Sequence, residues 1–142
     1  MPREQHVSGR SLPRVIVAAV IIVDGRVLAA ERSAPPEVAG RWEFPGGKVE
    51  PGETDAQALA RECREELGVR VQVGGRVGPD VSLAHGRAVL RVFLVELLGG
   101  DMPEALEHTA LRWLAADELG SVQWLPADQP IVAELPQLLA LP

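Results

Sequence analysis

The chain has 142 residues, of which 46% are apolar and 24% are charged, and its formal net charge is −6. This length and composition predict one globular domain over residues 1–142 with its own core. The negative charge excludes an overall positive field, so we expect neither a nucleic-acid polymer nor an anionic membrane as a partner. Cys63 is the single cysteine, which excludes an internal disulfide and favours a reducing, cytoplasmic location.

The N-terminal part of the chain predicts a tail followed by a hairpin. Residues 1–12 lack the apolar segment of a signal peptide and are expected to form a flexible tail. The β-branched run at 15–23 predicts a buried strand and is too short to span a bilayer. An Asp-Gly pair at 24–25 predicts a hairpin turn, with the returning strand at 27–32.

The middle of the chain predicts one clear helix after a loop and short extended segments rich in Pro and Gly. Thr54 is the expected N-cap, and Gln57 lies three residues later, which is the spacing of a capping box. Gly68 is the expected stop. An apolar stripe at helical spacing is formed by Ala56, Leu59, Ala60, Cys63 and Leu67.

The remainder of the chain predicts further strands and short helices. Residues 69–78, 88–98 and 109–115 are expected to be strands. A short helix is expected at 115–120 and a final one from 130 onward, with Pro136 as a break. Many strands with few helices favour an α/β fold in which helices flank a mixed sheet.

An unusual concentration of carboxylates lies on the predicted helix. Glu62 and Glu66 are four residues apart, Glu65 is beside them, and all three lie next to the apolar stripe. Arg61 can offset part of their repulsion by pairing with Glu65 and with Glu53. Several carboxylate oxygens without His or thiolate suit Mg²⁺ or Mn²⁺. From the helix alone, a solvated acidic face is the favoured interpretation. The Gly-rich segment ahead of the helix shifts the balance toward a metal site, because its carbonyls could add ligands.

The segment 47–69 resembles the Nudix box, G-x5-E-x7-R-E-U-x-E-E-x-G-U, where U is an aliphatic residue. Cys63 stands at the first U position and is the one departure from the motif. A match of this length is highly specific. The matching positions are Gly47, Glu53, Arg61, Glu62, Glu65, Glu66, Gly68 and Val69.

This resemblance implies a Nudix fold, in which a mixed, curved β-sheet lies between α-helices (α/β/α). It also implies hydrolysis of a nucleoside diphosphate linked to another moiety. The metal ligands implied for Mg²⁺, with Mn²⁺ as a substitute, are Glu62, Glu65, Glu66 and the Gly46 carbonyl.

The resemblance further implies catalytic roles for three box residues. Glu62 is the first choice for assisting deprotonation of the attacking water. Glu53 is expected either to brace Arg61 or to assist with that water.

Outside the box, the chain is similar to MutT-type nucleoside triphosphate pyrophosphatases. In register with that group, Arg32 and Lys48 are expected to contact phosphate, with the base as an alternative partner for Arg32. Glu107 matches a further metal-binding carboxylate, or is a simple loop residue. Asp128 stands where members specific for 8-oxoguanine place a base-reading Asn.

The residue at 128 favours a cytidine substrate. An ionised Asp can only accept hydrogen bonds, which suits the exocyclic amine of cytosine. We therefore expect cleavage of the α–β phosphate bond of CTP, dCTP or 5-methyl-dCTP, with 8-oxo-dGTP or another NDP-X compound as the alternative. Leu83 and Phe44 are further candidates to contact the base, although Phe44 suits a core position equally well. We expect a monomer or a homodimer.

Overall fold

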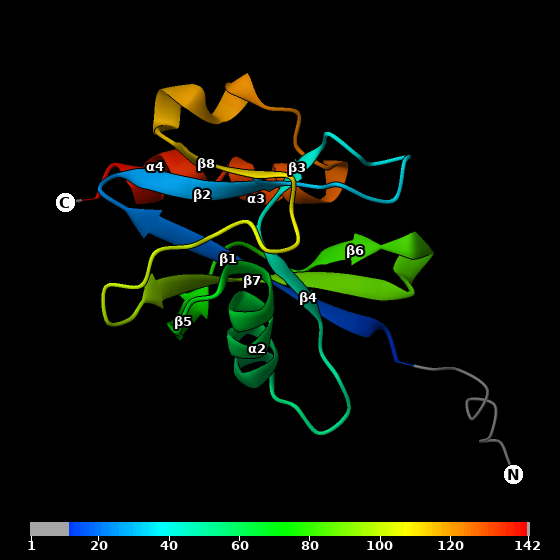
Figure 1. Ribbon diagram of the computed structural model, residues 1–142. Coiled ribbons are helices and arrows are strands. Elements are labelled where there is room, and N and C mark those ends of the chain that lie inside the picture. The colour runs from blue at the N-terminus through cyan, green and yellow to red at the C-terminus, as the bar shows by residue number, and fades with distance from the viewer. Residues whose placement is uncertain (1–11, 142) are drawn as a thin grey trace, which may run out of the picture.

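The computed structural model describes residues 12–141 (Figure 1), so the predicted tail lies outside the described residues except for Leu12. Among them, eight strands form one mixed sheet. The strands are β1 (Arg14–Val23), β2 (Arg26–Glu31), β3 (Trp42–Glu43), β4 (Gly46–Lys48), β5 (Val71–Arg76), β6 (Val81–Leu83), β7 (Ala88–Leu97) and β8 (Ala110–Leu114).

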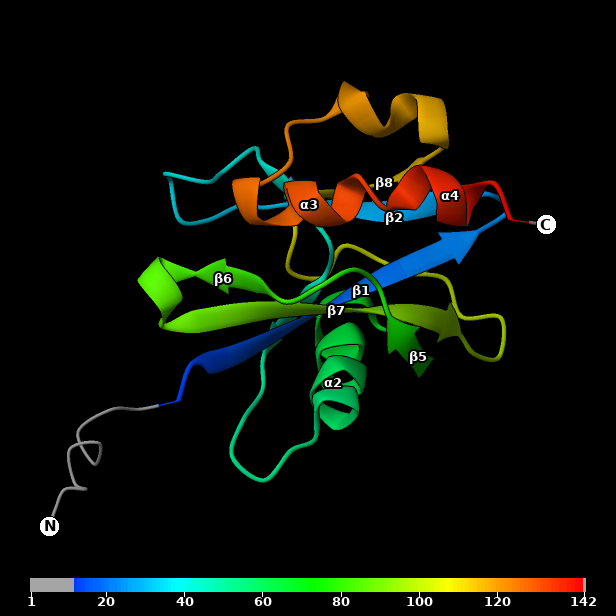
Figure 2. The ribbon, with the colours of Figure 1, turned by 180° about the vertical axis from the view of Figure 1, so that it is seen from behind.

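Helices lie on both faces of this sheet (Figures 1 and 2). The α-helices are α2 (Asp55–Leu67), α3 (Gln129–Val132) and α4 (Leu135–Leu139). The 3₁₀-helices are η1 (Ala84–Gly86), η2 (Ala116–Ser121) and η3 (Pro126–Asp128). The long helix α2 lies on one side of β1 and β7, whereas α3 and α4 lie on the other, which confirms the predicted α/β fold with helices flanking a mixed sheet.

Strand β1 is the centre of the sheet. It pairs in parallel with β7 from Arg14 to Ile21 and antiparallel with β4 at Ile16–Ala18. Its far end turns into β2 through Asp24 and Gly25, which have φ values of 52° and 75°. Two successive positive φ values are typical of the tight hairpin turn that an Asp-Gly pair predicts.

Alternate residues of β1 build the two halves of the core. Val17, Ala19 and Ile21 pack with α2 in one cluster, and Ala18 and Val20 pack with the C-terminal helices in the other. All five are at most 3% exposed. Burial on both faces explains why the sequence of β1 is continuously apolar instead of alternating.

Helix α2 begins and ends where the sequence predicts. The Thr54 side chain accepts a hydrogen bond from the Gln57 amide, and the Gln57 side chain accepts one from the Thr54 amide. Gly68 ends the helix in the left-handed conformation, with φ 69° and its N–H bonded to the Arg64 carbonyl. The acidic box residues are therefore held on a helix with defined termini.

Two elements differ from the sequence-based expectation. Strand β6 was not predicted, because three residues carry little periodicity and owe their conformation to pairing with β7. The expected final helix is divided into α3 and α4, with Pro136 in the first turn of α4. No helix within 12–141 is long and apolar enough to cross a membrane.

Candidate functional site

The three carboxylates of α2 lie at different depths. Glu66 is only 8% exposed, and the Glu62 side chain is 14% exposed. The Glu65 side chain, at 51%, faces solvent. The helix therefore directs Glu62 and Glu66 toward strand β4 and leaves Glu65 at the rim.

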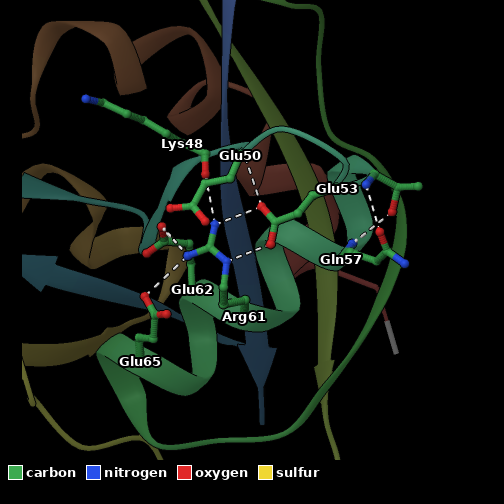
Figure 3. A network of polar contacts seen from close by, with 8 residues as sticks. Lys48, Glu50, Glu53, Gln57, Arg61, Glu62 and Glu65 are labelled. Atoms are coloured by element: carbon green, nitrogen blue, oxygen red, sulfur yellow. Dashed lines mark hydrogen bonds and ion pairs between the residues drawn. The ribbon is translucent and has the colours of Figure 1, made fainter.

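Arg61 connects these carboxylates to the loop before the helix (Figure 3). Its Nη1 donates to Glu62 at 3.1 Å and to Glu65 at 3.3 Å, and its Nη2 donates to the Lys48 carbonyl at 3.1 Å. The same guanidinium donates to both oxygens of Glu53, so the predicted pairing of Arg61 with Glu53 and Glu65 is confirmed. These bonds hold the pKa of Glu53 down at about 2, with the Arg61 hydrogen bond as the main cause.

The buried Glu66 carboxyl is short of positive partners. Its Oε1 accepts a hydrogen bond from the Gly46 amide at 3.2 Å. Burial, followed by repulsion from Glu62 and Glu43, raises the pKa of Glu66 to about 9. Glu62 is bound by Arg61, but Glu66 has only the Gly46 amide as a described donor, so the buried side of this pair is an environment that a divalent cation would neutralise. Carboxylate oxygens suit such a hard cation. Glu62 and Glu66 therefore fit a divalent cation.

The other predicted metal ligands do not form a cluster of carboxylates with Glu62 and Glu66. Within residues 12–141, no three His, Cys, Asp or Glu side chains are clustered closely enough to hold a metal ion. Glu65 is turned outward to Arg61, and Glu107 lies on a separate loop. The metal roles of Gly46, Glu65 and Glu107 stay predictions.

Two glycines on β4 allow the strand to pass close to its neighbours. A side chain at Gly46 would collide with the backbone of Val17 and Ala18 on β1. A side chain at Gly47 would collide with the Glu62 carboxylate. The strand thus approaches β1 on one side and the acidic helix on the other, which no larger residue permits.

Two cavities adjoin beside β3 and β4, and the smaller one reaches the acidic helix at Glu66. A small cavity of about 220 Å³ contains Glu66, Glu107 and His108 along its wall. A larger cavity of about 720 Å³ extends toward β6 and η3. Both cavities are lined by Arg32, Glu43 and Gly46.

The larger cavity brings together the residues predicted to contact phosphate and base. Its wall includes Lys48 and Leu83, whereas Phe44 lies at its inner side, 3% exposed, with its ring centroid 4.9 Å from that of Trp124. Phe44 is therefore a core residue as well as a wall residue. Glu53, Arg61, Glu62 and Glu65 line neither cavity.

Asp128 is the buried acid of the larger cavity. It is 4% exposed and lines the cavity from η3. Burial and the negative charge of Glu43 raise the pKa of Asp128 to about 8, against an opposing effect of Arg32. The carboxyl is therefore neutral near pH 7, so it can donate as well as accept a hydrogen bond. This differs from the ionised Asp assumed from the sequence.

Two residues of the site were not singled out by the sequence. Glu43 lines both cavities and His108 lines the small one, and His108 Nε2 is 2.9 Å from the Glu43 carboxylate. They are separated by 65 positions in the chain. Apart from the position of Glu43 in the segment just before Gly46, no periodicity or spacing in the sequence indicates this contact.

Known proteins resemble this chain over most of its length. The sequence pattern of the NUDIX domain matches residues 12–136. The "Putative 8-oxo-dGTP diphosphatase 2" of Mycobacterium tuberculosis is 50% identical over 131 residues, covering 90% of this chain and 92% of the relative. The CTP pyrophosphohydrolase of Escherichia coli is 43% identical over 118 residues, covering 82% of this chain and 87% of the relative.

A solved structure supports the same assignment. The solution structure of the Escherichia coli ORF135 protein superimposes with a TM-score of 0.75 at 34% identity. The superposition covers 99% of this chain and 96% of that protein. Sequence pattern, relatives and architecture agree, and the chain therefore belongs to the Nudix family of hydrolases.

Proposed function

We propose that this hydrolase is a Mg²⁺-dependent nucleoside triphosphate pyrophosphohydrolase acting in the cytoplasm on CTP, dCTP or 5-methyl-dCTP. It cleaves the α–β phosphate bond and releases a nucleoside monophosphate and pyrophosphate. The observation that carries this proposal is the junction of two cavities at Arg32, Glu43 and Gly46. One cavity is acidic, and the other holds Lys48 and the buried Asp128.

Box residues hold and prepare the reacting groups. Glu62 and Glu66 would hold the cation, with Glu65, Glu107 and the Gly46 carbonyl as further ligands. A bound divalent cation supplies charge neutralisation for the phosphates and lowers the pKa of an attacking water. Mn²⁺ would substitute for Mg²⁺ because both suit oxygen ligands.

The positions of Arg61 and Glu53 support different roles for Glu62 and Glu53. Glu62 accepts the proton of the attacking water and is oriented by its 3.1 Å contact with Arg61. Glu53 braces Arg61, since both of its oxygens accept from that guanidinium and its pKa is near 2. A proton acceptor with so low a pKa is a weak base near neutral pH.

A hydrolytic route without a covalent enzyme intermediate is supported by Cys63. Its thiol is fully buried in the core beneath α2. Burial, followed by the charges of Glu66 and Glu62, raises the pKa of this thiol to about 12. A buried, protonated thiol is a poor nucleophile.

Asp128 reads the base. A neutral carboxyl matches the Watson–Crick edge of cytosine, because its O–H donates to N3 while its carbonyl accepts from the N4 amine. The same neutral group also matches O6 and N1–H of guanine. The name of the Mycobacterium tuberculosis relative supports 8-oxo-dGTP as the second candidate, and that of the Escherichia coli relative supports CTP.

A product assay with separate nucleotides tests this function. The protein is incubated with Mg²⁺ and, in turn, CTP, dCTP, 5-methyl-dCTP, 8-oxo-dGTP and dGTP, and the products are resolved by chromatography. We expect CMP or dCMP together with pyrophosphate. Absence of CMP, dCMP and 5-methyl-dCMP rejects the cytidine substrate, and release of 8-oxo-dGMP alone selects the second candidate. A parallel incubation with a dinucleotide and with a sugar nucleotide tests the other NDP-X compounds. Release of a phosphorylated non-nucleoside group there, without turnover of the triphosphates, indicates such a substrate.

A further inference from the structure

We propose that His108 is a positioning residue that holds Arg32 in its nucleotide-facing orientation through Glu43. This inference rests on the proposed function, because Arg32 is taken to contact the substrate. The three side chains form a chain from the buried side of the small cavity to the wall that both cavities share.

Glu43 is bound from two sides. Its Oε1 accepts a hydrogen bond from Arg32 Nη1 at 3.3 Å, and its Oε2 lies 2.9 Å from His108 Nε2. A carboxylate only accepts, so Nε2 of the imidazole is the donor. With both oxygens occupied, the Glu43 carboxylate has little freedom to rotate away from Arg32.

The Arg32 guanidinium is fixed in a plane by these contacts. Its Nε and Nη2 donate to the Ala34 carbonyl at 3.0 and 2.8 Å, while Nη1 donates to Glu43. The Arg32 side chain is 36% exposed, so it remains accessible from the cavities. A half-exposed Arg held at both edges is preorganised to receive a nucleotide without first losing rotamer freedom.

His108 is itself firmly placed. The preceding Leu106 amide donates to the Glu66 carbonyl at 3.1 Å, and the following Thr109 amide donates to the Glu31 carbonyl at 2.9 Å. These bonds fix the segment between α2 and β2. The backbone on both sides of His108 is therefore anchored, to α2 through Glu66 and to β2 through Glu31, and this fixes the imidazole beside Glu43.

The burial of His108 indicates that its polar side chain is needed for the contact with Glu43. The side chain is 6% exposed, and its Nδ1 is buried without a hydrogen-bond partner among residues 12–141. An apolar side chain would fill this position without leaving a buried polar atom unpaired. Within residues 12–141, the contact with Glu43 is the hydrogen bond that accounts for a polar imidazole at this buried position.

Steady-state kinetics with CTP and a double-mutant cycle test the proposal. His108→Leu removes the donor and is expected to raise KM about tenfold while kcat changes less than about twofold. His108→Gln keeps an N–H donor and is expected to restore KM to within about threefold of the wild-type value. In an Arg32→Ala background, His108→Leu is expected to add less than about twofold to KM, because its effect runs through Arg32.

A matched control separates positioning from loosening of the loop. Arg70 is exposed and pairs with Asp101 at 3.1 Å, which tethers the same segment away from both cavities. Arg70→Gln is expected to leave KM and kcat within about twofold of wild type. A KM rise as large as that of His108→Leu would show that loop order alone is responsible and would overturn the proposal. Equal costs of His108→Leu in the wild-type and Arg32→Ala backgrounds, or a His108→Gln variant as impaired as His108→Leu, would do the same.

A second readout is independent of turnover, so failure of the proposed function can be distinguished. The Arg32 Nε–H signal in a ¹⁵N-labelled sample is identified by its loss in Arg32→Lys. It is expected to be protected from exchange in the wild-type protein and to shift and exchange faster in His108→Leu. If no nucleotide is hydrolysed, the proposed function fails, and the Arg32 signal alone then tests the positioning role of His108. An Arg32 signal that is unchanged in His108→Leu rejects that role.

Discussion

Arg61 binds Glu53 through two parallel hydrogen bonds, from Nε to Oε2 at 2.7 Å and from Nη2 to Oε1 at 2.9 Å. The second oxygen also accepts the Glu50 amide at 2.9 Å. Such fork-to-carboxylate pairing fixes direction as well as distance. The loop before α2 and the acidic face of α2 are therefore held together by one guanidinium (Figure 3).

Replacing this guanidinium by an amine tests its orienting role. Arg61→Lys keeps the charge but cannot bind Glu53, Glu62 and the Lys48 carbonyl in one plane. We expect kcat for CTP to fall by about 10- to 100-fold, with KM changing much less. The measurement is initial-rate kinetics with Mg²⁺. Arg64→Lys, an exposed site on the same helix, is the matched control and should retain normal turnover.

Removing the Glu66 charge tests the metal assignment. In the absence of divalent cations, a carboxyl whose pKa is raised from 4.5 to about 9 contributes stability that is complete below pH 4.5. That contribution is lost as pH rises toward about 9. We therefore expect Glu66→Gln to reduce the fall in Tm between about pH 5 and about pH 9 and to abolish turnover.

Cation binding gives the complementary measurement for Glu66. Millimolar Mg²⁺ is expected to raise the Tm of the wild-type protein at about pH 8 by about 3 °C or more, and that of Glu66→Gln by much less. Differential scanning fluorimetry records both. Asp117→Asn, at an exposed site on η2, serves as the control. Equal Mg²⁺ shifts in wild type and Glu66→Gln would contradict the metal assignment.

The pH dependence of base preference tests Asp128. Below its pKa of about 8 the carboxyl is neutral and can donate to cytosine N3; above it, the donor is lost. An ionised carboxylate instead accepts well from N1–H and N2–H₂ of a guanine base. We expect the ratio of kcat/KM for CTP over that for 8-oxo-dGTP to fall about tenfold from about pH 6.5 to about pH 9.

Asp128→Asn provides the control for this pH effect, because an amide does not titrate in that range. Its base preference should be independent of pH. Since the folded-state pKa of Asp128 is raised from 3.8, its stability contribution is complete below pH 3.8 and is lost as pH rises through about 8. Asp128→Asn should thus also show a higher Tm than wild type at about pH 9. A ratio that changes equally in both proteins would remove Asp128 as the base reader.

Substitution of the two glycines of β4 should affect different properties, stability for Gly46 and turnover for Gly47. A Cβ at Gly46 meets the backbone of β1, which cannot move without disturbing the central strand. Gly46→Ala is therefore expected to lower Tm by about 5 °C or more. The nearest atoms to a Cβ at Gly47 are those of the Glu62 carboxylate, so Gly47→Ala should lower kcat at least about tenfold with a smaller loss of Tm. Thermal melts and CTP kinetics on both variants make the comparison.

Local signals made helix α2 predictable from the sequence. The capping box at Thr54 and Gln57, the stripe through Leu59 and Cys63, and the Gly68 stop all act within a few residues. The same locality made the contacts of Arg61 with Glu53 and Glu65 foreseeable, because both partners lie within eight positions. Strand β1 was also evident, since its run of buried residues needs no partner to be recognised.

Long-range contacts account for what the sequence did not reveal. The depth of Glu66 and the solvent exposure of Glu65 depend on how β4 crosses α2, which is not encoded in the helix itself. The neutral state of Asp128 depends on its burial and on the charge of Glu43, which is distant in the chain. Likewise, His108 could not be linked to Glu43 before the loop carrying it was placed beside β2.

The two faces of strand β1 have an evolutionary consequence. Val17, Ala19 and Ile21 support the acidic helix, whereas Ala18 and Val20 support the segment that carries Asp128. Under the proposed function, substitutions on the second side would alter base selection while the side that supports the acidic helix keeps its packing. One strand would then separate the phosphate chemistry from the choice of nucleotide, an arrangement that lets substrate range diverge by small steps.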